Sequence, residues 1–579
     1  MKPKNYFLNP KSAQQRQYEA LRTFYITELS AEETAKKYNF SPAYFKKLRF
    51  EFSKNLKEGV NTFFLPKKPG PKKRLTNSDT VDRIISLRKQ NYSVNDIKVV
   101  LDTENRIVSL ETIDQILKAE GFAPLPKRTR QERINIQLPK KIEPPKSISL
   151  ELIDEEFTTE LNVGPLLFLP LIEEMDIVPA IKSSGFPHTS ALSDVQCVLS
   201  FLVLKLAGCK RWSNDTMWNM DRALGFFAGL NVLPKSTTLS TYSYRTTRSA
   251  NRDLLVKMCQ IFKDEESEDG EFNLDFKSIP HWGNESVLEK NWSGARSKSI
   301  KSLLSLIVQS PTDGNLTYTN AELKHCNQND AVFDFIDFWK QDRGVAPKML
   351  IFDSKFTTYK NLNKLNQSDE NIKFLTLRRR GKNLIEKANR IPALHWQRIK
   401  VKRAGKREQL VSVHDGRCKL SAYKGEVRQI ILKDHGCEKP SFLITNDFKI
   451  DVHQIVQKYA RRWLVEQEIA EQIAFFSLNN PSSSIIVKVD FDLTISLLAH
   501  NLYREFSKKL LGFEQCNVQT INRKFLENGA LIKVKENDVS VILKKKSHIP
   551  ILFESPWMKK TTMLSWMGVK INFSQGTTS

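Results

Sequence analysis

The chain has 579 residues, more than one hydrophobic core organises, because single cores stop growing at roughly 250 to 300 residues. Its hydrophobic and aromatic contents, 40% and 10%, are those of a folded protein and exclude a mainly disordered chain. The formal net charge of +25 favours a polyanionic partner, with nucleic acid first, over a surface that is merely rich in lysine.

The first quarter of the chain is strongly basic. Residues 1–140 hold 28 Lys and Arg and 15 Asp and Glu, so 28 − 15 = +13. The apolar spacing predicts three helices, over residues 14–28, 31–38 and 42–52. Ser30 and Ser41 are expected to cap the second and third helices. This pattern indicates a first helix-turn-helix DNA-binding module over residues 1–60, with a plain helical hairpin as the alternative. Its recognition helix presents three cations to DNA, Lys46, Lys47 and Arg49.

A basic linker over residues 61–77 separates this module from the next. Its Pro and Gly content argues against a helix, and its charge suits contacts with phosphates or a minor groove. The cations expected to bind DNA are Lys72, Lys73 and Arg74. Three more helices, each expected to open with a serine cap at Ser78, Ser93 or Ser109, indicate a second helix-turn-helix module over residues 78–125. A second basic tether follows over residues 126–147.

The remainder predicts a multidomain α/β protein. Residues 148–268 are expected to form a helical domain. From residue 269, the order three strands, helix, strand, helix, strand is that of a ribonuclease H-like α/β core. The predicted parts are the first part of the core over 269–396, an inserted β-rich subdomain over 397–450, a core helix bearing a third acid over 451–514, and a C-terminal accessory region over 515–579.

Three acids stand in contexts that favour a metal site. Asp275 lies inside an apolar strand, where an unpaired carboxylate is costly to bury. Asp353 ends the strand Met-Leu-Ile-Phe, so it is expected at the carboxyl edge of the sheet. Glu466 lies in a long helix predicted over residues 454–476, on one face with Tyr459 and Arg462. Taken singly, the two aspartates also fit turn acids, and Glu466 also fits a surface ion pair with Arg462.

Together these segments resemble the Asp-Asp-Glu transposases of bacterial insertion sequences. Tyr459-Ala-Arg-Arg462-Trp-Leu-Val-Glu466 is similar to the family helix Tyr-x2-Arg-x3-Glu-x6-Lys. The segments Asp353-Ser-Lys-Phe-Thr-Thr-Tyr and Leu377-Arg-Arg-Arg-Gly look like those around the family's second acid. The resemblance covers residues 270 to 505. One departure is Ile473, which stands at the position of the family lysine.

The resemblance implies a DNA transposase that binds the ends of its mobile element and catalyses cleavage and strand transfer. Asp275, Asp353 and Glu466 are the expected catalytic residues and ligands of two Mg²⁺ ions, which Mn²⁺ could replace, because hard cations take oxygen ligands. Tyr459 and Arg462 are expected to hold phosphates beside the cleavage site. Arg296 and Lys298, in a basic turn after the first acid, are expected to position a strand. The implied partners are double-stranded DNA, from element ends and target, and a second copy of the chain.

Two other functions fit the same residues. A transposase-derived regulator would bind DNA without cutting it, and a ribonuclease H-like nuclease would cut without strand transfer. Seven cysteines without a CxxC pair argue against a zinc module and a disulfide framework. The sequence shows no apolar run long enough for a membrane span, so we expect a cytoplasmic protein, associated with the nucleoid in a bacterium.

Overall fold

A computed structural model describes twelve segments of the chain: residues 13–27, 29–57, 76–90, 92–125, 154–160, 162–210, 217–262, 270–281, 288–293, 297–402, 408–481 and 485–576. The chain divides into two compact units, residues 1–74 and residues 75–579. The boundary falls inside the predicted linker over 61–77. Most of that linker and the whole tether over 126–147 lie outside the described residues.

The first unit contains three helices: α2 (Ala13–Ile26), α3 (Ala31–Lys37) and α4 (Pro42–Lys57). Ser30 begins α3 with a capping box, because its hydroxyl accepts from the Glu33 backbone N–H while the Glu33 carboxylate accepts from the Ser30 N–H. The buried core is small and consists of Ala20, Leu21, Ala35 and Phe45. The helices therefore lie where the sequence predicts them, and α4 runs further than expected.

The second unit begins with α5 (Ser78–Lys89), α6 (Val94–Thr103) and α7 (Leu110–Ala119). Ser93 and Ser109 cap α6 and α7 as predicted, but Asn77 rather than Ser78 caps α5, because the Asn77 side chain accepts from the Asp79 N–H. Their apolar core also includes Ile485 and Val487 at the start of a much later helix. These three helices thus share one compact unit with the rest of residues 75–579.

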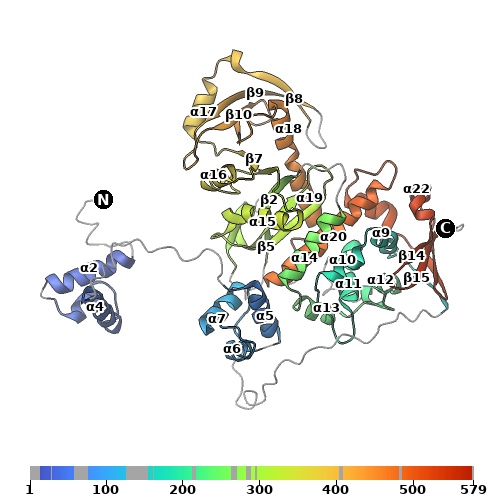
Figure 1. Ribbon diagram of the computed structural model, residues 1–579, viewed down its shortest axis with the longest axis horizontal. Helices are drawn as coiled ribbons and strands as arrows, with labels where there is room; N and C mark the ends of the chain where they lie inside the picture. The colour runs from blue at the N-terminus through green and yellow to red at the C-terminus, as the bar shows by residue number, and fades with distance from the viewer. Residues whose placement is uncertain are drawn as a thin grey trace. The chain divides into compact units, whose positions relative to one another are not determined.

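Helices and a small sheet share the largest hydrophobic core with the central sheet. The helices of the predicted helical domain are α9 (Leu169–Glu174), α10 (Ile177–Ser183), α11 (Asp194–Leu206), α12 (Arg222–Phe227), α13 (Ser236–Ser243) and α14 (Arg248–Ile261). The small sheet has the order β1-β12-β13-β15-β14. Its strands are β1 (Glu155–Thr159), β12 (Ala530–Lys535), β13 (Asp538–Leu543), β14 (Thr562–Leu564) and β15 (Val569–Gln575). The C-terminal region is therefore tied to the segment before α9 by strand pairing (Figure 1).

The central sheet has β2 (Glu271–Pro280) as the third strand from one edge. Its other strands up to residue 377 are β3 (Lys290–Ser293), β4 (Lys298–Gln309), β5 (Leu316–Leu323), β6 (Met349–Phe352) and β7 (Lys373–Leu377). β2 pairs antiparallel with β4 and parallel with β6, while β7 runs parallel to β6. The parallel connections pass through α15 (Ala331–Arg343) and α16 (Tyr359–Gln367), because parallel neighbours require a crossover.

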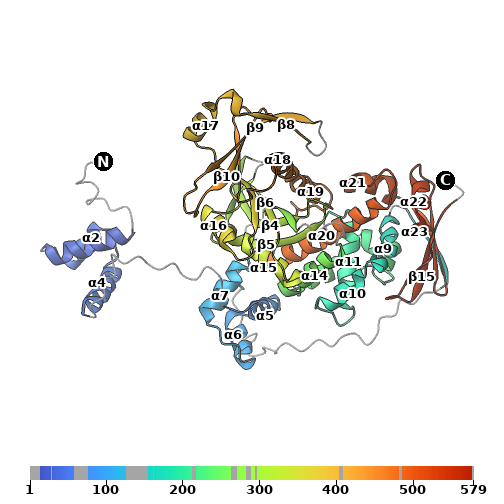
Figure 2. The same ribbon diagram turned by 45° about the horizontal axis from the view of Figure 1, so that its top comes forward.

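The predicted insertion does not form a sheet of its own. After α17 (Lys382–Asn389) come β8 (Gln397–Val401), β9 (Gln409–Cys418), β10 (Val427–Lys433) and β11 (Ser441–Thr445). β11 pairs with β7, so the order β7-β11-β10-β9-β8 extends the central sheet. Figure 2 shows β8, β9 and β10 above β4 and β6 in the view. The free backbone groups at the edge of β7 are satisfied in this way.

The long helix predicted over 454–476 is two helices, and this corrects the prediction. α18 (Val452–Arg461) ends and α19 (Trp463–Ala474) begins on either side of Arg462, whose N–H donates to the Tyr459 carbonyl three residues back. The buried helix α20 (Ile486–Lys508) follows, and then α21 (Val518–Ile521), α22 (Ile549–Glu554) and α23 (Pro556–Lys559). No helix in the described segments is both long and apolar enough to cross a membrane.

Candidate active site

Asp275 and Asp353 come from neighbouring parallel strands. Leu274 of β2 lies opposite Phe352, the last residue of β6. Asp275 is the next residue of β2, and Asp353 directly follows β6. Burial raises the pKa of Asp275 to about 6, and the charges of Glu466 and Asp353 add to this rise, whereas Arg462 opposes it. The fold therefore brings the charges of all three predicted acids close enough to act on one carboxyl group.

Arg462 joins the acid of β2 to the acid of α19. Its Nη1 lies 3.5 Å from Asp275 Oδ2, and its Nη2 donates to Glu466 Oε1 at 2.5 Å. The guanidinium carbon is also 5.5 Å from the centre of the Tyr459 ring. The turn at Arg462 thus directs this side chain between two carboxylates, and its side chain is only 13% exposed.

An ion pair between Lys458 and Glu271 holds α18 against the same strand. Lys458 Nζ lies 2.5 Å from Glu271 Oε1. Lys277, two residues after Asp275, shares its face of β2, and burial lowers the pKa of its ammonium while the charge of Asp275 raises it. Sequence reasoning missed Lys458 and Lys277, although the two-residue spacing from Asp275 was a signal for Lys277.

The donor set suits a hard divalent cation, because the predicted ligands are carboxylate oxygens and Asp275 is largely buried. Arg462 holds two of the three acids near one another, since its guanidinium pairs with Asp275 and Glu466. Within the described segments, one trio of His, Cys, Asp or Glu has its ligand atoms within 4.8 Å of one another, and it is Glu468, Glu471 and His500. The predicted acids are thus more widely spaced than this trio.

The other predicted DNA-binding residues are dispersed. Lys298 opens β4 and is exposed, while four lie outside the described residues, Lys72, Lys73, Arg74 and Arg296. Lys46 and Lys47 are exposed on α4. Arg49, in contrast, stacks on the Phe24 ring with 3.7 Å between the guanidinium carbon and the ring centre. Ile473 packs against the hydrophobic core.

The two three-helix segments differ in charge. Residues 13–57 hold nine Lys and Arg and five Asp and Glu, so 9 − 5 = +4. Residues 76–125 hold six and eight, so 6 − 8 = −2. On α7, Asp114 pairs with Lys118, and Glu111 is exposed beside them. Arg248 of α14 binds Glu120 at 2.8 Å, which attaches the end of α7 to the body of the unit.

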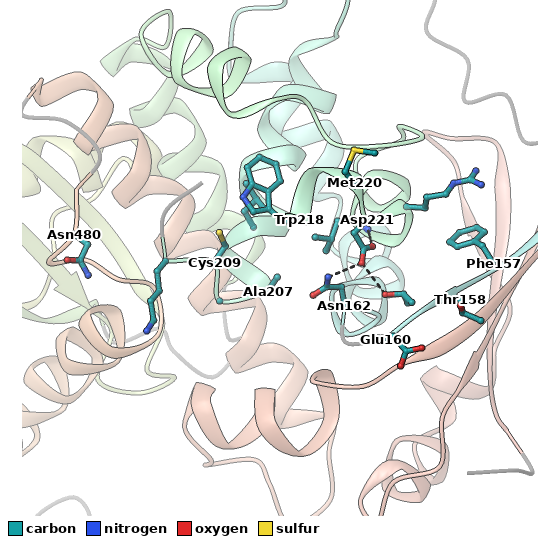
Figure 3. Close-up of a pocket in the computed structure, with 16 residues that line it drawn as sticks. Phe157, Thr158, Glu160, Asn162, Ala207, Cys209, Trp218, Met220, Asp221 and Asn480 are labelled. Carbon is teal, nitrogen blue, oxygen red and sulfur yellow. Dashed lines mark hydrogen bonds between the residues drawn. The ribbon is translucent and has the colours of Figure 1, made fainter. Parts of the chain in front are cut away.

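A large cavity lies elsewhere in the second unit, and none of the three acids lines it. Its volume is about 1050 Å³, and Phe157, Asp221 and Asn480 are among its lining residues (Figure 3). Asp221 accepts hydrogen bonds from Asn162 and Thr159, so its carboxylate ties the segment around β1 to α12. Residues 211–216 follow the lining residue Lys210 in the sequence and lie outside the described segments.

Comparisons with known proteins give structural likenesses but no sequence match. The sequence matches no protein-family model and no curated protein. The fold is similar to a piggyBac transposase. That structure is a synaptic complex with hairpin DNA, determined by cryo-EM, and the likeness covers 64% of this chain and 82% of that chain, with 12% identity and a TM-score of 0.35.

Proposed function

We propose that the protein is a DNA transposase with a ribonuclease H-like catalytic core. The observation that carries the proposal is that Asp275 on β2 and Asp353 after β6 follow paired residues of neighbouring strands, while Arg462 links Asp275 to Glu466 on α19. The strand order β5-β4-β2-β6-β7 supports the core that the sequence predicts. Acids at the ends of adjacent strands are well placed to act on one phosphodiester.

In this proposal Asp275, Asp353 and Glu466 hold two Mg²⁺ ions. When bound, the ions supply activation of the attacking oxygen and stabilisation of the leaving one. Arg462 then exchanges its carboxylate partners for a phosphate, for which its planar guanidinium is suited. Tyr459, whose pKa burial raises far above the ordinary value, stays neutral and packs beside that phosphate.

The first unit is proposed to bind the element ends. Its basic helix α4 exposes Lys46 and Lys47, and nine of the residues over 13–57 are Lys or Arg. Phosphate contacts of this kind give affinity that falls with salt. Two ends must be joined in one reaction, so the proposed active form on DNA is a homodimer. Lys298 and Arg296 are proposed to position a strand beside the acids.

Cleavage of labelled end DNA by the full chain tests the proposal. The intact chain is compared with Glu466→Gln and with Glu386→Gln, a control that removes an exposed acid of α17. We expect cleavage with Mg²⁺ or Mn²⁺, joined products with a target plasmid, and loss of both only in Glu466→Gln. Nicks without joined products favour a nuclease, and specific binding without cleavage by the intact chain favours a DNA-binding regulator.

A further inference from the structure

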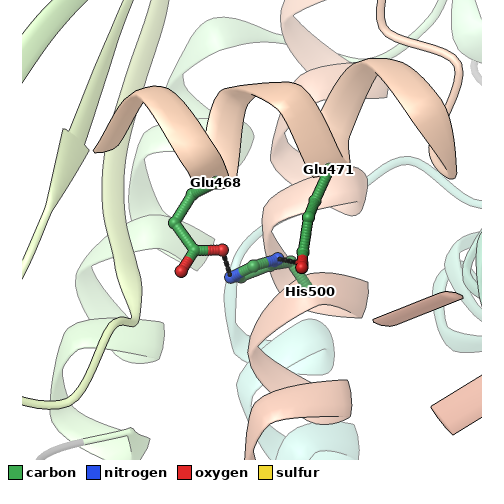
Figure 4. Close-up of side chains that lie close together, drawn as sticks. All are labelled: Glu468, Glu471 and His500. Carbon is green, nitrogen blue, oxygen red and sulfur yellow. Dashed lines mark ion pairs between the residues drawn. The ribbon is translucent and has the colours of Figure 1, made fainter. Parts of the chain in front are cut away.

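Two carboxylates and an imidazole meet between α19 and α20. Glu468 and Glu471 lie on α19, and His500 lies on α20. One ligand atom from each residue lies within 4.8 Å of the other two, and Figure 4 shows the imidazole between the two carboxylates. Glu468 follows Glu466 by two residues, a rotation of about 200° around the helix, so it faces away from the proposed catalytic acids.

The environment of His500 is unusual for a buried histidine. Its side chain is 0% exposed. The Gly314 backbone is close enough to act on the ring, but neither ring nitrogen has a hydrogen bond of good geometry. Glu468 Oε2 nevertheless lies 3.1 Å from Nε2, and Glu471 Oε2 lies 3.9 Å from Nδ1. The Glu468 oxygen is therefore within hydrogen-bond distance without lying on the line along which an N–H group would donate, and the Glu471 oxygen lies beyond that distance. Buried polar groups left in this state call for an ion or an ordered water.

We propose that Glu468, Glu471 and His500 bind a divalent transition-metal cation. Two ligand atoms about 2.1 Å from one Zn²⁺ are separated by about 3.0 to 3.4 Å, and their lone pairs point at the cation rather than at each other. The 3.1 Å between Glu468 Oε2 and His500 Nε2 falls within this range of distances. An imidazole with carboxylates suits Zn²⁺ or Mn²⁺, whereas the three acids of the proposed catalytic site suit Mg²⁺.

The local charge also supports a cation. Two glutamates with 11% and 22% exposed side chains face the cluster, and such carboxylates are costly to bury without positive charge. Arg504, one turn after His500 on α20, lends its positive charge to both. The guanidinium offsets one of the two carboxylate charges, so the ionised pair keeps a negative charge that attracts a cation. Bound there, the cation would fasten α19, which carries Glu466, to the buried helix α20.

The test measures metal bound by the full chain after the proposed catalytic ligands have been removed. The background is the triple variant Asp275→Asn, Asp353→Asn and Glu466→Gln, so any remaining site is a different one. Into it we introduce Glu471→Gln or His500→Gln, with Glu505→Gln as a matched change at another acid of α20. Zn²⁺ and Mn²⁺ contents after dialysis, the melting temperature with either ion, and the visible absorption of added Co²⁺ are recorded.

We expect about one equivalent of Zn²⁺ or Mn²⁺ per chain in the triple variant and in the Glu505→Gln control. Glu471→Gln and His500→Gln should weaken the affinity by about tenfold or more. Should His500→Gln fail to fold, Glu471→Gln and the Co²⁺ spectrum of the triple variant decide the question. A triple variant without bound metal or a metal-dependent melting shift overturns the proposal and leaves a metal-free network. Retention of metal by a folded His500→Gln variant also overturns it. None of these outcomes depends on DNA cleavage.

Discussion

Replacement of Asp275 by Asn is expected to stabilise the metal-free protein. Burial and the neighbouring acids raise the pKa of this carboxyl from 3.8 to about 6, which shows that the folded state disfavours its charge. Two pKa units correspond to about 3 kcal/mol. Since the Asp275 side chain is still 23% exposed, we expect a gain in unfolding free energy of about 1 to 3 kcal/mol above pH 6.

The difference in stability between the native protein and Asp275→Asn depends on pH. Because the folded pKa exceeds the unfolded one, the folded state holds more protons between about pH 4 and pH 6. The native protein thus loses stability as the pH rises through that window, and Asp275→Asn does not. The difference between the two should be near zero at pH 4 and complete above pH 6.

Thermal unfolding with a chelator at pH 4.5 and pH 8 checks the expectation. For a unit that spans residues 75–579, the unfolding entropy is about 1 kcal/mol per kelvin, so the melting temperature should rise by about 1 to 3 °C at pH 8. Glu386→Gln, an exposed acid of α17, should show no such change. A lower melting temperature of Asp275→Asn at pH 8, or an equal difference at both pH values, would refute the reasoning. Added Mg²⁺ should stabilise the native chain and not the variant.

Three further outcomes are expected. The double variant Lys46→Gln, Lys47→Gln should bind end DNA more weakly, and the slope of log affinity against log salt concentration should fall by about 2. Fluorescence anisotropy at several salt concentrations measures both. An unchanged slope would place end recognition elsewhere. Lys118→Gln on the acidic α7 should leave that binding unchanged, and a clear loss would assign DNA contacts to α5–α7. Burial lowers the pKa of Lys89 to about 7, so the unfolded state holds more protons between pH 7 and the ordinary lysine range. Stability should therefore rise with pH across that interval, and Lys89→Met should flatten the rise in thermal melts; parallel curves would contradict this.

Local features of the fold could be predicted from residues close in sequence. Ser30, Ser93 and Ser109 cap helices because a hydroxyl reaches a backbone N–H two or three residues away. The same reasoning predicted the cap of α5 one residue too late, at Ser78, because the preceding Asn77 supplies the capping side chain. The strands with Asp275 and Asp353 are also local patterns of apolar residues.

Long-range contacts could not be predicted in this way. The break at Arg462 depends on ion pairs with residues of β2 and α19. The joining of β11 to β7 depends on which edge of the sheet remains open after β6 and β7 have paired. The carboxylates of α19 and His500 meet only because α20 packs across the core.

The sequence by itself determined the basic first unit, the order of strands and helices, and the three acids with Arg462 in their contexts. These follow from composition and from spacings within a few residues, which act before the chain folds. The tertiary structure alone decided that α5–α7 are attached through Arg248, that Arg462 lies between two carboxylates, and that Glu468, Glu471 and His500 share one buried space. Burial and the approach of distant charges set these features, and both exist only in the folded chain.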